Sequence, residues 1–241
     1  MNLITGDSHS TTICFNNSIH ILCSAGSAKG LNNPNSISQY NTKLINNIKT
    51  NNYSNLFFLF GGVDVDFCFI HKYLKNINID YKEFNLDVIN NYLNFITNNF
   101  FDKSVIILSI GLPCLDDENF TKGILNGHIN LLENQDINLL KKDLLSCTGL
   151  PDIYKRTEIT LHFNKTLEEE IIKTNKTNKT NIKYLDITSF TYDCNLKRIK
   201  DEYFTRNDHH NLNRNTHFNK IIDEYLLNSE FYTFSHLKRP F

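Results

Sequence analysis

The chain has 241 residues, with 25 Lys and Arg against 26 Asp and Glu, which gives a formal net charge of -1. This balance excludes the strongly basic surface of a non-specific nucleic-acid binder or of a binder of acidic membranes. Hydrophobic residues make up 40% of the sequence, which excludes disorder over most of its length. The length suits one large α/β domain, so we expect a single domain over residues 1–241.

The sequence carries no sign of membrane insertion or secretion. No stretch approaches the roughly 18 consecutive apolar residues that a membrane-spanning helix needs. The N-terminus also lacks the basic and then apolar pattern of a signal peptide. We therefore expect a soluble, cytoplasmic protein with neither a membrane nor a nucleic acid as partner, and the oligomeric state stays open.

Short apolar runs alternate with helix-like stretches, which is the sequence pattern of βα units and a parallel sheet. The predicted strands, in chain order, are Asn2–Thr5, Ser18–Cys23, Leu56–Phe60, Ser104–Ile110 and Ile182–Ile187. Apolar residues spaced three to four apart predict helices at Ser38–Thr50, Phe84–Phe100, Thr166–Lys173 and Thr216–Leu227. The fold class is therefore α/β. We expect a flavodoxin-like three-layer α/β/α fold with a five-stranded, mainly parallel sheet in the order 2-1-3-4-5.

Two segments fall outside this alternation. Residues 114–154 contain Leu-rich pieces but no convincing strand, so we expect a helical insertion there. The polar repeat Thr174–Thr180 is typical of a solvated loop before the last strand.

Ligands of an open parallel sheet gather at the carboxyl ends of its strands, so the residues after each strand are candidates for a site. The first strand runs into Gly6–Ser10, where a serine at a helix N-terminus has backbone N–H groups that can support an oxyanion. The alternative is an ordinary capped helix start. The second strand runs into Cys23–Leu31, whose small residues let backbone amides approach a ligand, or simply form a glycine turn.

The third strand is followed by Gly61, Gly62 and two carboxylates, Asp64 and Asp66, that one residue separates. The two carboxylates share a face if the chain is extended there, and they diverge if it is helical. Metal binding is one interpretation, but the sequence shows no third and fourth oxygen ligands. Ordinary loop carboxylates are the other interpretation.

A last candidate group precedes the final predicted helix, where Asp208 stands beside His209 and His210. An imidazole and a nearby carboxylate supply a proton acceptor and a group that orients it. Zinc binding is the rival interpretation, but adjacent histidines cannot easily bind one ion and the cysteines lie elsewhere in the sequence. We predict no metal site.

Taken in order, these pieces resemble the SGNH/GDSL hydrolase family. That family has a Gly-Asp-Ser block after the first strand, a glycine block after the second, a Gly-x-Asn-Asp block after the third and an Asp-x-x-His block before the last helix. Gly6, Asp7 and Ser8 match the first block in full. The resemblance implies Ser8 as the nucleophile, with its N–H and that of Gly26, or failing it Gly30, in an oxyanion hole. It also implies that no cofactor is needed.

Two of the four blocks depart from the family pattern. Val63 stands where the family has its oxyanion-hole asparagine, and losing one such donor costs about two to three orders of magnitude in rate. Asn211, not histidine, lies three residues after Asp208. The base is therefore His210 or His209, with Asp208 as its carboxylate, or the site is degenerate. We favour His210 and expect it to face Ser8.

The resemblance implies a serine esterase or acyltransferase that works through a Ser-His-Asp acyl-enzyme on a small-molecule or glycan ester, with O-acylated carbohydrates as the expected class. Hydrolysis and acyl transfer share that intermediate, so the sequence does not separate them. One alternative is a catalytically weak protein of this fold that binds a glycan or a partner. Another is a metal-dependent phosphoesterase. Four further residues are expected to shape the site: Asp7, His9, Gly62 and Asp64.

Overall fold

The computed structural model describes residues 1–241 except 16, 37, 76–78, 124–149, 205–214 and 229–241. Its described part contains a five-stranded sheet in the order β2-β1-β3-β4-β5, and every neighbouring pair is parallel. These strands are β1 (Asn2–Gly6), β2 (Ser18–Leu22), β3 (Leu56–Leu59), β4 (Val105–Leu108) and β5 (Ile182–Leu185). The predicted α/β fold class and strand order are confirmed.

The position of each strand in the sheet explains its composition. Every residue of β3 and β4, which have neighbours on both sides and helices over both faces, is buried, and both strands are unbroken apolar runs. β2 lies at the edge of the sheet, where Ile19, His20 and Leu22 are exposed. The polar residues of β2, Ser18 and His20, therefore stay partly or fully exposed to water, and their desolvation costs the fold little free energy.

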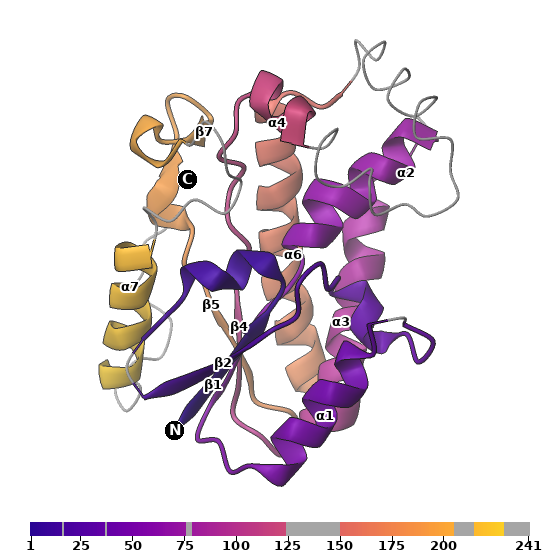
Figure 1. The fold of residues 1–241 in the computed structure, drawn as a ribbon, viewed down its shortest axis with the longest axis vertical. Coiled ribbons are helices and arrows are strands. Elements are labelled where there is room, and N and C mark those ends of the chain that lie inside the picture. Colours follow the sequence, from indigo (N-terminus) through magenta and orange to yellow (C-terminus); the bar gives the residue numbers. More distant parts are fainter. Residues whose placement is uncertain (16, 37, 76–78, 124–149, 205–214, 229–241) are drawn as a thin grey trace.

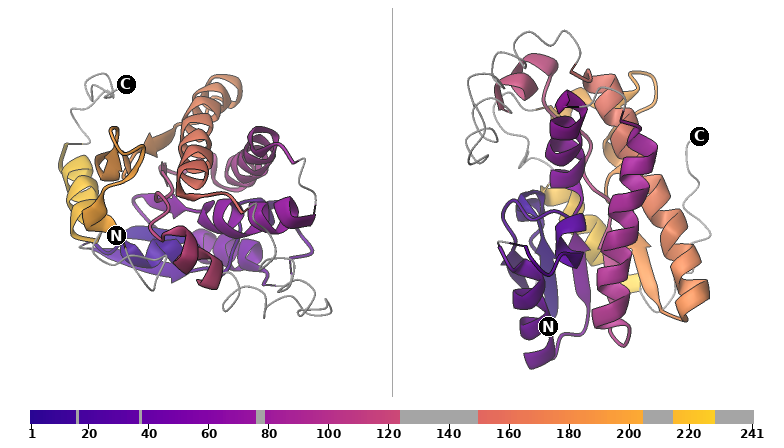
Figure 2. Two further views of the ribbon diagram at one scale, coloured as in Figure 1. Left: turned by 90° about the horizontal axis from the view of Figure 1, so that it is seen from above. Right: turned by 90° about the vertical axis from the view of Figure 1, so that its right-hand side faces the viewer.

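Helices cover the sheet on both faces (Figures 1 and 2). One face carries α1 (Tyr40–Thr50), α3 (Tyr81–Phe100) and α6 (Ile153–Asn178), whereas α7 (Asn215–Asn228) lies on the other side of the sheet. α3 and α6 pack along one another, and the Asn85 amide donates to the Ile159 carbonyl oxygen at 3.1 Å between them. The core between these layers is rich in aromatic rings, including Phe57, Phe58, Phe60, Tyr92 and Phe163.

One helix is much longer than its predicted range Thr166–Lys173. α6 begins at Ile153 because the Asp152 carboxylate caps it, accepting from the Lys155 N–H at 2.8 Å. It continues to Asn178 and ends at Lys179, which has a left-handed backbone with φ 53°. The prediction of a loop over Thr174–Thr180 was therefore wrong for most of that segment, whose Asn and Thr side chains form the polar surface of the last helical turns.

Shorter elements complete the described part. A π-helical turn at Asp64–Cys68 and α2 (Phe69–Lys75) follow β3, and neither was predicted. Of the insertion expected over residues 114–154, the structure describes α4 (Asp117–Gly123) and the start of α6, while 124–149 lie outside the described residues. A short antiparallel pair, β6 (Tyr192–Asp193) and β7 (Arg198–Ile199), follows β5. No helix within the described ranges is long and apolar enough to cross a bilayer.

Candidate functional site

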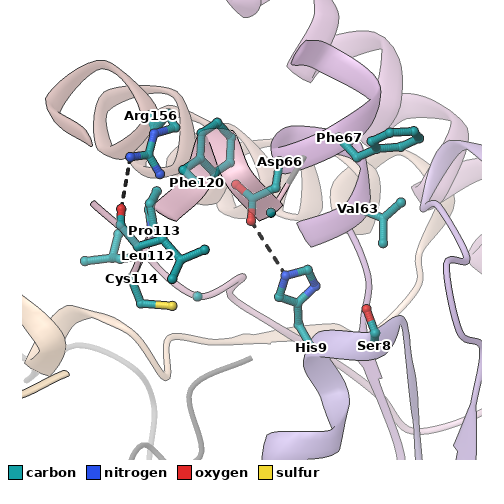
Figure 3. Close-up of a pocket in the computed structure, with 13 residues that line it drawn as sticks. Ser8, His9, Val63, Asp66, Phe67, Leu112, Pro113, Cys114, Phe120 and Arg156 are labelled. Carbon is teal, nitrogen blue, oxygen red and sulfur yellow. Dashed lines mark hydrogen bonds and ion pairs between the residues drawn. The ribbon is translucent and has the colours of Figure 1, made fainter. Parts of the chain in front are cut away.

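A pocket lies at the carboxyl edge of the sheet, and the segments after β1, β3 and β4, together with α6, form its walls (Figure 3). Ser8 and His9 belong to the 3-10 helix η1 (Ser8–Thr12), directly after β1. Val63, Asp66 and Phe67 come from the segment after β3. The segment after β4 and one residue of α6 complete the lining with Gly111, Leu112, Pro113, Cys114, Leu115, Phe120, Gly123 and Arg156. The pocket therefore joins the Gly-Asp-Ser block to the third block of the predicted site.

The Asp7 carboxylate fixes the position of Ser8. Asp7 is fully buried and caps η1, because its Oδ1 accepts from the His9 backbone N–H at 2.9 Å. Its Oδ2 accepts from the Val63 N–H at 3.3 Å. One carboxylate thus ties the segment after β1 to the segment after β3.

His9 lies between two carboxylates. Its Nδ1 is 3.0 Å from Asp7 Oδ1, and its Nε2 is 3.6 Å from Asp66 Oδ2, on the pocket side of the ring (Figure 3). Burial alone would lower the pKa of the imidazole, but Asp7 and Asp66 outweigh it and raise the pKa to about 10. The ring is therefore an imidazolium near neutral pH.

Asp64 and Asp66 point in different directions because the chain between them is helical. The Asp64 carboxylate is buried and accepts from the Ala28 N–H at 2.6 Å and from the Lys29 N–H at 3.4 Å. Burial raises its pKa to about 7, despite these backbone donors. Asp64 therefore holds the loop after β2 to the segment after β3, and it does not share a metal with Asp66. No cluster of metal-ligating side chains occurs among the described residues.

The glycines of the loop after β2 use their N–H groups within that loop. Gly26 donates to the Cys23 carbonyl oxygen at 2.8 Å, and Gly30 donates to Ser27 Oγ at 2.9 Å. Neither glycine lines the pocket. The assignment of Gly26, or of Gly30, to an oxyanion hole with Ser8 stays a prediction, and these contacts do not support it.

Ser10 forms a second serine–histidine contact, with the edge-strand residue His20. Ser10 Oγ lies 2.9 Å from His20 Nε2 and donates to the Asp7 carbonyl oxygen at 2.7 Å. Because the hydroxyl proton is used in that bond, the imidazole must be the donor to Ser10. Ser10 is fully buried and outside the pocket lining, so this pair stabilises the turn that carries Ser8.

Arg156 is the functional candidate that sequence reasoning missed. It is only 3% exposed, and its guanidinium donates to the carbonyl oxygens of Leu115 at 3.0 Å and Pro151 at 3.2 Å. It also pairs with the Asp117 carboxylate at 2.8 Å and lies 4.0 Å from the centre of the Phe120 ring. Arg156 thereby fastens one pocket wall to α6. A single arginine in a segment without a motif gives no sequence signal for this role.

The predicted acid–base group lies outside the described residues. Asp208, His209 and His210 fall in the range 205–214, so their predicted relation to Ser8 is untested.

Comparisons with known proteins bear on the fold. No protein-family model and no curated protein sequence matches this chain. A GDSL-like lipase from Bacteroides thetaiotaomicron is similar in structure, with 12% identity, a TM-score of 0.50 and coverage of 95% of this chain and 88% of that one. This chain has the GDSL-like fold. A Streptococcus pneumonia protein, provisionally assigned as a platelet activating factor, also matches, with 13% identity, a TM-score of 0.52 and coverage of 93% and 83%.

At these identities the likeness concerns the GDSL-like fold and not the reaction. It confirms the fold that the Gly6–Ser8 block and the order of the other blocks implied.

Proposed function

We propose that this protein is a serine esterase or acyltransferase of the SGNH/GDSL type, with Ser8 as its nucleophile. The observation that carries the proposal is the place of Ser8, which follows β1 directly and lines a pocket at the carboxyl edge of a sheet with the GDSL-like fold. Ligands of open α/β sheets bind at this edge.

The reaction begins when Ser8 Oγ attacks an ester carbonyl carbon while a base takes the hydroxyl proton. By the family resemblance, His210 is that base and Asp208 orients it. The departing alcohol leaves an acyl-enzyme on Ser8. Water then completes a hydrolysis, or a second alcohol completes an acyl transfer. The proposed substrates are small-molecule or glycan esters, with O-acylated carbohydrates as the leading class.

Val63 lowers the rate that we expect. Its side chain lies in the pocket lining and offers no hydrogen-bond donor, and its backbone N–H donates to Asp7. Without the family's asparagine, the developing oxyanion loses a donor worth about two to three orders of magnitude in rate.

Labelling with a fluorophosphonate tests the proposal, because the reagent bonds to an activated serine and not to a spectator. We expect wild-type protein to be labelled and Ser8→Ala to stay unlabelled. Ser24→Ala is the matched control, since it removes an exposed serine hydroxyl in the loop after β2, outside the pocket lining. Labelling of Ser8→Ala at the wild-type level contradicts the proposal. So does a wild-type protein that the reagent does not label.

Val63 also favours a second candidate function, a binding protein of the same fold with little chemistry. This candidate predicts no labelling of Ser8, together with binding of an O-acylated oligosaccharide that titration calorimetry detects equally in wild type and Ser8→Ala.

A further inference from the structure

The pocket wall after β4 is attached to α6 at both of its ends. At the start of the wall, the Asn164 side chain accepts from the Ile110 N–H at 2.9 Å and donates to the Ile110 carbonyl oxygen at 2.9 Å. At the other end, the Arg156 guanidinium donates to the Leu115 carbonyl oxygen at 3.0 Å. Asn164 and Arg156 both belong to α6, so one helix places both ends of the wall.

The middle of this wall packs against a different element. Leu112 and Cys114, which line the pocket (Figure 3), are buried in a second apolar cluster with Ile199 of β7 and with Tyr203. This cluster is separate from the main core. Ile199 is fully buried, lies outside the described pocket lining, and belongs to a strand that also lies against α6. The β6–β7 hairpin thus supports the pocket wall from behind.

Several contacts hold the hairpin itself in one shape. Its two strands pair antiparallel, and the Lys200 N–H donates to the Thr191 carbonyl oxygen at 2.9 Å. Lys200 Nζ also donates to the Phe190 carbonyl oxygen at 2.6 Å. The Tyr203 ring packs edge-on against the Phe190 ring, with 5.9 Å between their centres. Because protein interiors are close-packed, a change of volume in this support is transmitted to the residues that it contacts.

We infer that the β6–β7 hairpin helps to determine which esters the pocket accepts, with Ile199 as a positioning residue that acts through Leu112 and Cys114. This inference rests on the proposed function, and it places a determinant of selectivity outside the pocket. Shortening the Ile199 side chain leaves a cavity behind the wall, and neighbouring residues relax part of the way into such a cavity. The wall then recedes, and the pocket favours larger esters.

Replacing Ile199 with alanine tests the inference through two ratios of kcat/KM. One ratio compares p-nitrophenyl butyrate with p-nitrophenyl acetate, which differ in the acyl group. The other compares butyl acetate with ethyl acetate, which differ in the alcohol. We expect Ile199→Ala to raise at least one of these ratios about 10-fold, the lower range for one methylene in an apolar pocket. Partial unfolding lowers the turnover of every ester in the same proportion, so it leaves both ratios unchanged.

Ile48→Ala is the matched control. Ile48 on α1 is as deeply buried as Ile199 but belongs to the main core, so the same loss of side chain leaves a cavity away from the wall. We expect Ile48→Ala to lower stability and to leave both ratios unchanged. If Ile199→Ala folds poorly, Ile199→Val with Ile48→Val as its control applies the same test, and Ile199→Val should shift the same ratio upward by less.

Wild-type ratios in the Ile199 variants, or an equal shift in the Ile48 variants, overturn the inference and leave the hairpin with a purely structural role. If Ser8→Ala turns over these esters at the wild-type rate, the proposed function itself fails. No variant of Ile199 can produce that result, so the two failures are distinct.

Discussion

Gly62 lies directly against the imidazole ring of His9. A Cβ atom at position 62 would come within 2.4 Å of His9 Nδ1 and 2.9 Å of Cγ, distances that no real Cβ tolerates. The second glycine of the Gly61–Gly62 pair is therefore required by a side chain from another strand's loop, and not by a turn.

Replacing Gly62 with alanine should lower the free energy of unfolding by about 1 to 3 kcal/mol, because the added methyl group forces His9 away from its place between the carboxylates. Urea denaturation measures the change. Gly123→Ala is the control, since within the described residues its added Cβ would meet only Leu115 Cδ1, at an ordinary 3.9 Å. If both variants are equally stable, the described packing of His9 is wrong.

Replacing Asp64 with asparagine should change how stability depends on pH. The folded pKa of Asp64 is about 7, above its ordinary value of 3.8, so between these values the folded state binds more protons than the unfolded state. The wild type therefore loses up to about 1.4 kcal/mol per pH unit from this group as pH rises through that window. Asp64→Asn lacks this loss. Its stability relative to wild type, from urea melts at several pH values, should rise between pH 4 and 7 and then level off; a constant difference would contradict the buried carboxylate.

Replacing Asp7 with asparagine should lower the pKa of His9, because it removes the carboxylate in closest contact with the ring. The titration of the His9 ring, followed by NMR of its Cε1–H, should move from about 10 toward the ordinary range near 6.5. Asp87→Asn, which removes the exposed partner of Lys29, should leave the titration in place. If the pKa of His9 is the same in Asp7→Asn as in the wild type, the contact between Asp7 and His9 does not form.

Replacing Arg156 with methionine should weaken substrate binding more than turnover. The change leaves the Leu115 and Pro151 carbonyl oxygens without their buried donor, so we expect a loss of about 1 to 3 kcal/mol in stability. The freed wall no longer closes around substrate, so KM for an ester should rise while kcat changes little. Lys165→Met, which removes an exposed and weakly paired cation on the same helix, is the control. A fall in kcat with KM unchanged would place Arg156 among the groups that stabilise the transition state instead.

The centre of the sheet was predictable because its strands are short apolar runs that depend little on distant contacts. Leu56–Leu59 and Val105–Leu108 are buried on both faces, and such strands are visible as unbroken Ile, Leu, Phe and Val residues. The Gly-Asp-Ser block was predictable for a related reason, since it follows β1 directly and its geometry is local.

The rest of the site depends on contacts between segments that are far apart in sequence. Whether Asp64 and Asp66 share a face depends on a π-helical turn, and no local pattern distinguishes that turn from an extended loop. Likewise, Asp66 is placed in the site by its contact with His9, which lies 57 positions earlier in the chain. Arg156 is placed there by its contacts with Leu115 and Phe120. Those pairings follow from how the helices and loops after the strands pack against one another, which a single sequence does not reveal.

The two walls of the pocket are held in different ways, so they should differ in how well they tolerate substitutions. The wall near Ser8 is held by buried carboxylates that each join two loops, Asp7 to the segment after β3 and Asp64 to the loop after β2. Substitutions there disturb several loops together. The opposite wall, residues 111–115, is fastened to α6 through the Arg156 side chain. Under the proposed function, libraries that vary Pro113 while keeping Arg156 and the buried Leu112 should therefore yield altered ester preferences without loss of Ser8.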